Sequence, residues 1–173
     1  MTRLFVAVWP AEHVIEHVRA IPRHGWEGVR WTPEANWHVT LQFLGDADPA
    51  AVIDVLSEAD LPSAIASVGS RPEVMARTSL VLPVNGVDGL ARAVRRATGA
   101  IGLGVGDQQF RGHLTIGRSR GKRAISPNRS VPARDRAVEF TVDEVALVAS
   151  RLSAQGATYT TLGMFTTSGG GGR

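Results

Sequence analysis

The residue types best suited to chemistry in this chain occur in two short segments of nearly identical pattern. Residues 37–41 have the sequence WHVTL and residues 112–116 have the sequence GHLTI. Each segment therefore carries a histidine, an apolar residue, a threonine and a second apolar residue. Because residues i and i+2 of a β-strand point to the same face, each segment places an imidazole beside a hydroxyl and turns its apolar side chains away.

Two such strands that met at a cleft would direct His38, Thr40, His113 and Thr115 at one pocket. Histidine can donate or accept a proton near neutral pH, since its unperturbed pKa is about 6.5. Displacement at phosphorus needs one group to deprotonate the nucleophile and another to protonate the leaving oxygen. Threonine hydroxyls can donate hydrogen bonds to the non-bridging oxygens, where charge accumulates. The pattern predicts acid–base cleavage of a phosphodiester, with no metal, no other cofactor and no covalent intermediate.

Hydrophobic patterning predicts the elements that must position these side chains. Strands are expected at residues 4–9, 29–31, 37–44, 64–70, 79–84, 110–118, 138–152 and 158–165, and helices at residues 11–21, 49–59 and 90–100. This order indicates an α+β fold of about seven strands and three helices. Each half of the chain holds one His-Thr strand, so pseudo-two-fold pairing of the halves would bring the two strands together. Residues 1–166 are expected to form one domain and residues 167–173 a flexible glycine-rich tail.

Composition restricts the class of protein. A chain of 173 residues suits one domain with a substantial core. The absence of cysteine excludes disulfides, a thiolate nucleophile and a cysteine-based zinc site. No apolar run approaches the roughly 20 residues of a membrane span, so no membrane partner is expected. A cytoplasmic monomer is the default expectation.

Basic side chains are concentrated in one part of the sequence. Residues 111–136 contain eight basic residues and one acidic residue, and all but one of the 19 basic residues of the chain are arginine. The planar arginine fork matches phosphate oxygens, so this region favours a polyanionic partner such as RNA. The alternative is that arginine simply replaces lysine throughout the protein. Residues 119–136 are expected to form an exposed, mobile loop.

Extended by a few residues, the two segments resemble the signatures of a known family. Residues 37–45, WHVTLQFLG, and residues 110–118, FRGHLTIGR, are similar to the two signature strands of the two-histidine (2H) phosphoesterases. The most similar branch is the RNA 2′,3′-cyclic phosphodiesterases, also called LigT-like proteins or 2′-5′ RNA ligases. The resemblance continues over most of the chain, through residues 3–8, 31–36, 142–147 and 157–160.

The resemblance implies a bilobal fold, in which two pseudo-symmetric antiparallel-sheet lobes carry helices outside and enclose a central cleft. It implies hydrolysis of the 2′,3′-cyclic phosphate end of an RNA to a 2′-phosphate, with tRNA fragments and cyclic nucleotides among the candidate substrates. Some members also join or open 2′-5′ linkages. By this resemblance His38 is the acid that protonates the departing O3′, and His113 is the base that activates water. Thr40, Thr115 and Arg118 would bind the phosphate.

Two positions depart from the family pattern. Gly112 stands where the family usually has proline, which predicts a looser start of the second signature strand because glycine does not fix φ. Ala149 stands where the family frequently has arginine, which predicts the loss of one contact to an anion. Both changes would affect substrate affinity more than the chemical step.

Other interpretations of the same sequence compete with this one. Residues 13–17, HVIEH, fit the inverted zinc-peptidase pattern, and His13 and His17 would share one face of a helix. The basic region also suits a non-catalytic RNA-binding module, although that leaves both His-Thr pairs unexplained. A third alternative is hydrolysis of another small cyclic phosphodiester. Residues 102–106, GLGVG, lack the Lys-Ser/Thr of a P-loop and are interpreted as a plain connector.

Aromatic residues near the signatures could stack on a nucleobase. Trp37 immediately precedes the first histidine, so strand alternation turns it away from the pocket and into the core. Phe110 lies three positions before the second histidine and would face away unless the backbone bends at Gly112. The alternation leaves the roles of Trp31 and Phe43 open.

Overall fold

The computed structural model describes residues 2–101, 109–121, 123–126, 136–153 and 156–168. In chain order its elements are β1 (Thr2–Val8), α1 (Glu12–Arg19), β2 (Val29–Trp31), the short 3₁₀ turn η1 (Glu34–Asn36), β3 (Val39–Gly45), α2 (Pro49–Glu58), β4 (Ala64–Val68), β5 (Glu73–Met75), β6 (Ser79–Asn85), α3 (Asp88–Thr98), β7 (His113–Ser119), β8 (Val138–Val142), β9 (Glu144–Ser153) and β10 (Gly156–Thr166). The three predicted helices and the α+β class are confirmed. Within the described residues there are ten strands, because β5 was not predicted and residues 138–152 form two strands.

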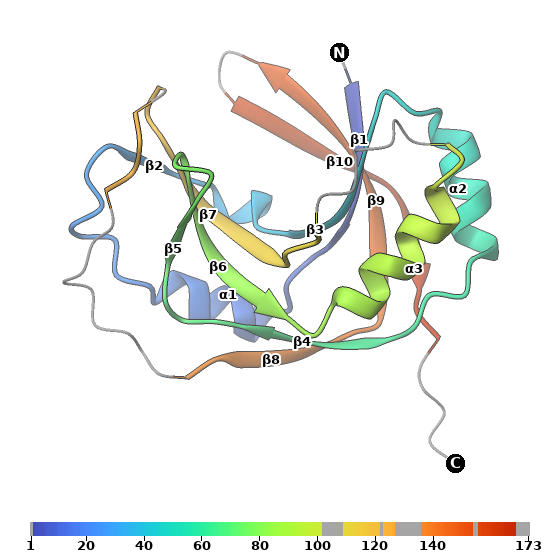
Figure 1. The fold of residues 1–173 in the computed structure, drawn as a ribbon, viewed down its shortest axis with the longest axis horizontal. Coiled ribbons are helices and arrows are strands. Elements are labelled where there is room, and N and C mark those ends of the chain that lie inside the picture. The colour runs from blue at the N-terminus through green and yellow to red at the C-terminus, as the bar shows by residue number, and fades with distance from the viewer. Residues whose placement is uncertain (1, 102–108, 122, 127–135, 154–155, 169–173) are drawn as a thin grey trace.

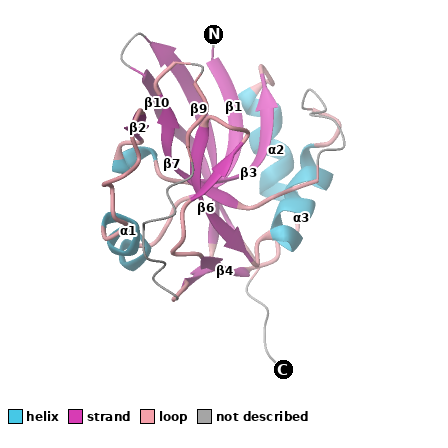
Figure 2. Ribbon diagram, turned by 60° about the vertical axis from the view of Figure 1, so that its left-hand side comes forward, coloured by secondary structure: helices cyan, strands magenta, loops and turns pink. Residues whose placement is uncertain are grey.

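The strands form one curled antiparallel sheet (Figure 2) in the order β10-β9-β1-β3-β7-β6-β4-β8, with β2 added to β7 and β5 added to β6. The two His-Thr strands, β3 and β7, are neighbours at the centre of this order. On one side of the junction lie β1, β9 and β10, and on the other lie β6, β4 and β8. The sheet therefore consists of two halves, each of which contributes one His-Thr strand.

The three helices pack on the sheet in two places. Figure 1 shows α2 and α3 side by side at one end and α1 at the other. α3 packs on β3, α2 packs on α3 and β10, and α1 packs on β8. The α2 helix begins as predicted, since the side chain of Asp48 accepts a hydrogen bond from the backbone N–H of Ala50 at 3.2 Å. No helix in the described part of the chain is long and apolar enough to cross a membrane.

Alternate residues of β1 point to opposite faces of the sheet, which gives the two faces different roles. Leu4, Val6 and Val8 belong to the main hydrophobic core, into which the apolar faces of all three helices also pack. Phe5 and Ala7 belong to a small separate cluster on the other face. That second face carries the main pocket of the molecule.

The C-terminal part of the described chain extends past the predicted domain boundary. Thr167 is buried, and its Oγ1 donates a hydrogen bond to the Val142 carbonyl at 2.9 Å. The backbone N–H of Ser168 donates to the Leu61 carbonyl at 2.7 Å. The packed chain thus reaches Ser168 rather than residue 166. Residues 169–173 of the predicted tail, residues 102–106 of the predicted connector, and most of the predicted basic loop (residues 122 and 127–135) lie outside the described residues.

Candidate active site

The two His-Thr strands meet through a single antiparallel residue pair, Val39 opposite Leu114. Both side chains are completely buried in the main core. The strands are therefore neighbours within one sheet rather than opposite walls of a cleft. The flanking histidines and threonines alternate to the opposite face, where the pocket lies.

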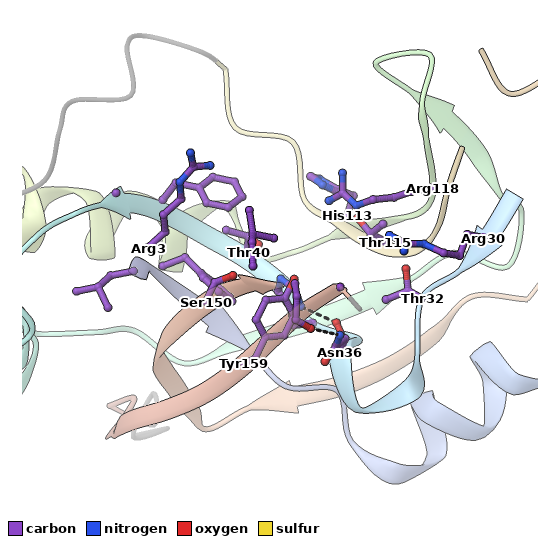
Figure 3. Close-up of a pocket in the computed structure, with 18 of the residues that line it drawn as sticks. Arg3, Arg30, Thr32, Asn36, Thr40, His113, Thr115, Arg118, Ser150 and Tyr159 are labelled. Carbon is purple, nitrogen blue, oxygen red and sulfur yellow. Dashed lines mark hydrogen bonds between the residues drawn. The ribbon is translucent and has the colours of Figure 1, made fainter. Parts of the chain in front are cut away.

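The structure brings all five predicted site residues to this pocket. In an antiparallel pair centred on Val39 and Leu114, His38 and Thr115 lie at one end while Thr40 and His113 lie at the other. These four side chains and Arg118 line a pocket of about 910 Å³. In Figure 3, the side chains of Thr40, His113, Thr115 and Arg118 all point into the pocket.

A β-bulge follows each threonine. The extra residue is Leu41 in β3, against β1, and Ile116 in β7, against β6. A bulge reverses the alternation of the residues that follow it. The residue three positions after each threonine therefore returns to the pocket face: Phe43 in β3 and Arg118 in β7. Strict alternation would have turned both away from it.

Both histidine rings are oriented by the backbone two residues earlier. His38 Nδ1 lies 2.7 Å from the carbonyl oxygen of Asn36, and His113 Nδ1 lies 2.8 Å from the carbonyl oxygen of Arg111. A carbonyl oxygen can only accept, so in each ring Nδ1 donates and the neutral ring keeps its lone pair on Nε2. In both histidines Nε2 is therefore the atom available for proton transfer.

Aromatic rings surround His38. The ring centroids of Phe5, Tyr159 and Trp9 lie 5.0, 5.1 and 5.8 Å from its imidazole. No such ring contact is recorded for His113 within the described chain. The two histidines therefore share an orientation but not an environment.

Burial lowers the pKa of His38 below its ordinary value. The hydrogen bond to the Asn36 carbonyl opposes this shift, while electrostatic interactions with His113 and Arg118 add to it. In the unliganded protein His38 is consequently neutral at pH 7. Burial also raises the pKa of Tyr159, and the charge of Arg118 opposes that rise.

The charge balance of the pocket is positive. Arg3, Arg30 and Arg118 line it, and the one acid among its described lining residues is Asp46. Asp46 follows the end of β3 that is remote from His38. The histidines therefore share their end of the pocket with cationic and hydroxyl groups, a surrounding that suits an anion.

Gly112 does not loosen the start of β7, contrary to the expectation from the sequence. It is buried, and its carbonyl accepts a hydrogen bond from the Val84 N–H at 2.9 Å. A Cβ at this position would lie 2.3 Å from the Val84 carbonyl oxygen. Glycine is therefore what lets β7 start in close contact with β6.

The second departure from the family pattern also has a different meaning in the structure. Ala149 is buried in the main core, so its side chain does not face the pocket. The neighbouring Ser150 lines the pocket instead. In this strand register a side chain at position 149 points into the core, so the structure does not support the predicted loss of an anion contact there.

The aromatic residues near the two signatures fall into two groups. Trp37 is buried as predicted, and its Nε1–H donates to the Thr32 carbonyl at 3.1 Å. Phe110 packs against the main core. Trp31 lies under the guanidinium of Arg23, 5.3 Å from its ring centroid. Phe43 alone among these lines the main pocket, with 56% of its surface exposed.

The histidines of the alternative zinc pattern bind backbone carbonyls. Nε2 of His13 lies 2.9 Å from the Glu139 carbonyl oxygen, and Nε2 of His17 lies 3.4 Å from the Gly69 carbonyl oxygen. The described residues contain no group of three or more His, Cys, Asp or Glu side chains placed to hold a metal ion. The pattern therefore finds no third ligand in this part of the chain.

Sequence reasoning missed the residues that define the environment of the histidines. Phe5 and Tyr159 come from strands at opposite ends of the chain and reach His38 only through the pairing of β1, β9 and β10. Asn36 orients His38 through its backbone carbonyl. Every residue type has this group, so the sequence could not indicate the contact. Arg30 enters the pocket because β2 pairs with β7. The sequence of a three-residue strand does not indicate its partner strand.

Comparisons with known proteins place this geometry in a family. The model of the LigT-like phosphoesterases matches residues 8–68. An RNA 2′,3′-cyclic phosphodiesterase of Aquifex aeolicus (strain VF5) is 32% identical over 152 residues, which cover 79% of this chain and 80% of that protein.

Solved structures share the fold over nearly the whole length. A crystal structure of a Thermus thermophilus protein aligns with a TM-score of 0.79 and 24% identity, covering 97% of this chain and 99% of that one. The crystal structure of E. coli LigT complexed with 3′-AMP aligns with a TM-score of 0.75 and 20% identity, covering 96% and 98%. The predicted two-lobed antiparallel fold is confirmed by these alignments. Taken together with the identity to the Aquifex protein, they make the chain a member of the LigT-like family of 2H phosphoesterases.

Proposed function

We propose that this phosphoesterase hydrolyses the 2′,3′-cyclic phosphate end of an RNA to a 2′-phosphate, with His38 and His113 as its acid and base. The observation that carries the proposal is the pair of imidazoles in one pocket, each held through Nδ1 by a backbone carbonyl so that Nε2 is available. The reaction class agrees with the activity by which the Aquifex relative is named.

The remaining predicted residues suit the binding of the reacting phosphate. Thr40 and Thr115 offer hydroxyl donors and Arg118 offers a guanidinium in the same pocket. Donors that are fixed before the reaction stabilise charge as it develops on the non-bridging oxygens. The presence of 3′-AMP in the E. coli LigT structure agrees with a pocket for a nucleoside phosphate.

In the proposed reaction, His113 Nε2 removes a proton from water, and the water oxygen attacks phosphorus. The bond from phosphorus to O3′ breaks, and His38 Nε2–H protonates O3′. The 2′-phosphate remains, and solvent returns the two histidines to their starting protonation states. The two histidines supply both proton transfers, so the proposal calls for no cofactor.

The acid role of His38 requires a proton that burial disfavours in the unliganded protein. A phosphate anion bound beside the ring favours the charged imidazolium and raises its pKa again. Substrate binding therefore supplies the charge that makes His38 a usable acid. With a ribose hydroxyl in place of water, the same displacement would join or open a 2′-5′ linkage.

The first test is incubation of the purified protein with an oligoribonucleotide that ends in a 2′,3′-cyclic phosphate, in excess EDTA. Product ends are identified against 2′- and 3′-phosphate standards. A 2′-phosphate supports the reaction, its regiochemistry and its independence of metal. Product that forms only when zinc or magnesium is restored would move the active site away from the His-Thr strands.

Absence of product under every condition would contradict the proposal and favour one of its alternatives. A non-catalytic RNA-binding module would retain oligonucleotides in a gel-shift assay, including after His38→Ala substitution. A hydrolase of another small cyclic phosphodiester would turn over that compound and not the RNA end. The cytoplasmic location and monomeric state expected from the sequence remain predictions.

A further inference from the structure

Two arginines face each other across neighbouring strands beside the histidines. Arg30 of β2 and Arg118 of β7 are direct partners in the antiparallel pairing of these strands. The Cβ atoms of direct partners are about 4.5–5.5 Å apart, and like charges at such positions destabilise the strand pair. An arrangement that is unfavourable in the empty protein becomes favourable when an anion binds beside it.

No carboxylate of the described chain neutralises this pair. The ion pairs among the described residues join Arg19 to Glu12 and Glu34, and Arg111 to Glu73. The recorded hydrogen bond of Arg118 goes to Ser79 Oγ at 3.4 Å. The acid that lines the main pocket, Asp46, follows the far end of β3. The two guanidiniums therefore leave an excess of positive charge at this point of the described structure.

The arginine pair stands where the main pocket continues into a smaller one. This second pocket has a volume of about 160 Å³, and Arg30, Arg118 and Thr32 line both pockets. Trp31 and Pro33 line only the smaller one, which has no acid among its described lining residues. Figure 3 shows the Arg30 and Arg118 side chains extending into the pocket from the same side, with the Thr32 hydroxyl near Arg30.

The two guanidiniums hold different positions relative to the reaction centre. Arg118 stands on β7, three residues after Thr115 on the strand that carries His113, whereas Arg30 reaches the pocket from the neighbouring strand β2. Arg118 is thus the one beside the residues assigned to the reacting phosphate, and Arg30 lies one strand away from them. A second anionic group, separated from the first, would meet Arg30 and the hydroxyl of Thr32.

We propose that Arg30, together with Thr32, binds the phosphate on the 5′ side of the nucleoside that carries the reacting cyclic phosphate. A cyclic mononucleotide lacks this phosphate, whereas the end of an RNA chain has it. The subsite therefore selects oligonucleotide ends over free nucleoside 2′,3′-cyclic phosphates. This inference rests on the proposed function and names the substrate class that the site prefers.

The kinetic test uses two substrates that differ in one group: adenosine 2′,3′-cyclic phosphate and the same compound with a 5′-phosphate. The wild-type protein is expected to show a kcat/KM about 10- to 100-fold higher for the 5′-phosphorylated substrate, the range of a charge-assisted hydrogen bond. Arg30→Gln should remove most of this preference through KM, and Arg30→Lys should retain part of it. For adenosine 2′,3′-cyclic phosphate itself, the kcat/KM of both variants should fall much less than it does for the 5′-phosphorylated substrate.

Arg120→Gln is the matched control, since it removes one positive charge from an exposed residue near β7 that lines neither pocket. It should keep the wild-type preference. The thermal stability of unliganded Arg30→Gln should not fall, because the substitution relieves a repulsion. A preference that is absent in the wild type, or unchanged in Arg30→Gln, overturns the inference while leaving the proposed function intact.

Binding measurements separate a failure of the inference from a failure of the proposed function. If the wild-type protein does not open the cyclic phosphate end of the oligoribonucleotide, the proposed function fails. Calorimetric titration with adenosine 3′-monophosphate and adenosine 3′,5′-bisphosphate then tests Arg30 alone. A tighter Kd for the bisphosphate that Arg30→Gln abolishes supports the subsite, and equal Kd values in the wild type refute it.

Discussion

The β3 and β7 halves of the site are built alike and yet present their histidines differently. In both halves a histidine is held by the carbonyl two residues earlier, a threonine follows, and a bulge comes next. His38, however, packs among three aromatic rings, whereas His113 has no ring contact recorded in the described chain. The local sequence determines the orientation of each ring, and residues from distant strands determine its surroundings.

The same contrast extends to the residue that each bulge returns to the pocket. In β3 it is Phe43, an exposed apolar ring, and in β7 it is Arg118, a cation. A pocket formed by two equivalent backbones is thus polarised by its side chains. Two nearly equal motifs can therefore serve unequal steps of one reaction.

The largest expected effect comes from removing the histidine of each half in turn. His38→Ala and His113→Ala should each lower kcat by roughly 10²- to 10⁴-fold, because each removes one of two proton transfers. The double variant should lose much less than the product of the two effects, as residues that act as a unit do. Initial rates on an oligoribonucleotide with a 2′,3′-cyclic phosphate end measure this.

The control for these variants is His17→Ala, which removes a histidine that contacts the Gly69 carbonyl outside the pocket. Circular dichroism and thermal melting establish that each variant is folded. Wild-type activity in either site variant would refute the two-histidine mechanism.

The equivalent residues Phe43 and Arg118 should give a smaller and unequal effect. Arg118→Gln should lower kcat/KM by about 10- to 100-fold, because it removes a charged donor from the phosphate site. Phe43→Ala should raise KM by only a few-fold, about the loss of one aromatic contact. Steady-state kinetics of both variants compare the two halves directly. A larger loss from Phe43→Ala than from Arg118→Gln would show that the polarity assigned to the pocket is reversed.

The residues that precede the two histidines differ as well, and they predict an effect on stability. Trp37 is buried in the core before His38, and Gly112 lies against the Val84 carbonyl before His113. Gly112→Ala should destabilise the protein by about 1–3 kcal/mol, because the backbone must shift to admit a Cβ. Denaturant unfolding measures this change, with Gly89→Ala as a control at a glycine whose Cβ would meet only the end of the Arg92 side chain, at 3.9 Å. An unchanged midpoint in Gly112→Ala would show that β7 is not held by this contact.

Part of this fold and site could be predicted because it depends on short-range sequence. The His-Thr strands, the three helices and the Asp48 cap follow from periodicity and from capping chemistry. The bulges could not be predicted, because an extra residue is defined only against a partner strand. The same holds for the rings around His38 and for Arg30, which reach the site through pairings remote in the sequence. Gly112 was misinterpreted because its contact with Val84 is also long-range.

The smallest expected effect concerns the protonation of His38, and it tests the contrast between the surroundings of His38 and those of His113. Since burial depresses the pKa of His38, its imidazole should titrate below the ordinary value of about 6.5 in the unliganded protein. In the unfolded chain His38 binds its proton at a higher pH than in the folded one. The free energy of unfolding should therefore rise with pH from the folded-state pKa up to about 6.5 and then level off.

Trp9→Ala should bring the titration of His38 back toward its ordinary pKa, because it removes one of the rings that exclude water. Binding of adenosine 3′-monophosphate should move it in the same direction, because an anion favours the imidazolium. NMR titration of the imidazole signals, assigned through His38→Asn, resolves both shifts. If His38 titrated at or above its ordinary pKa in the unliganded wild type, burial would not govern its charge, and substrate binding would not be needed to make it an acid.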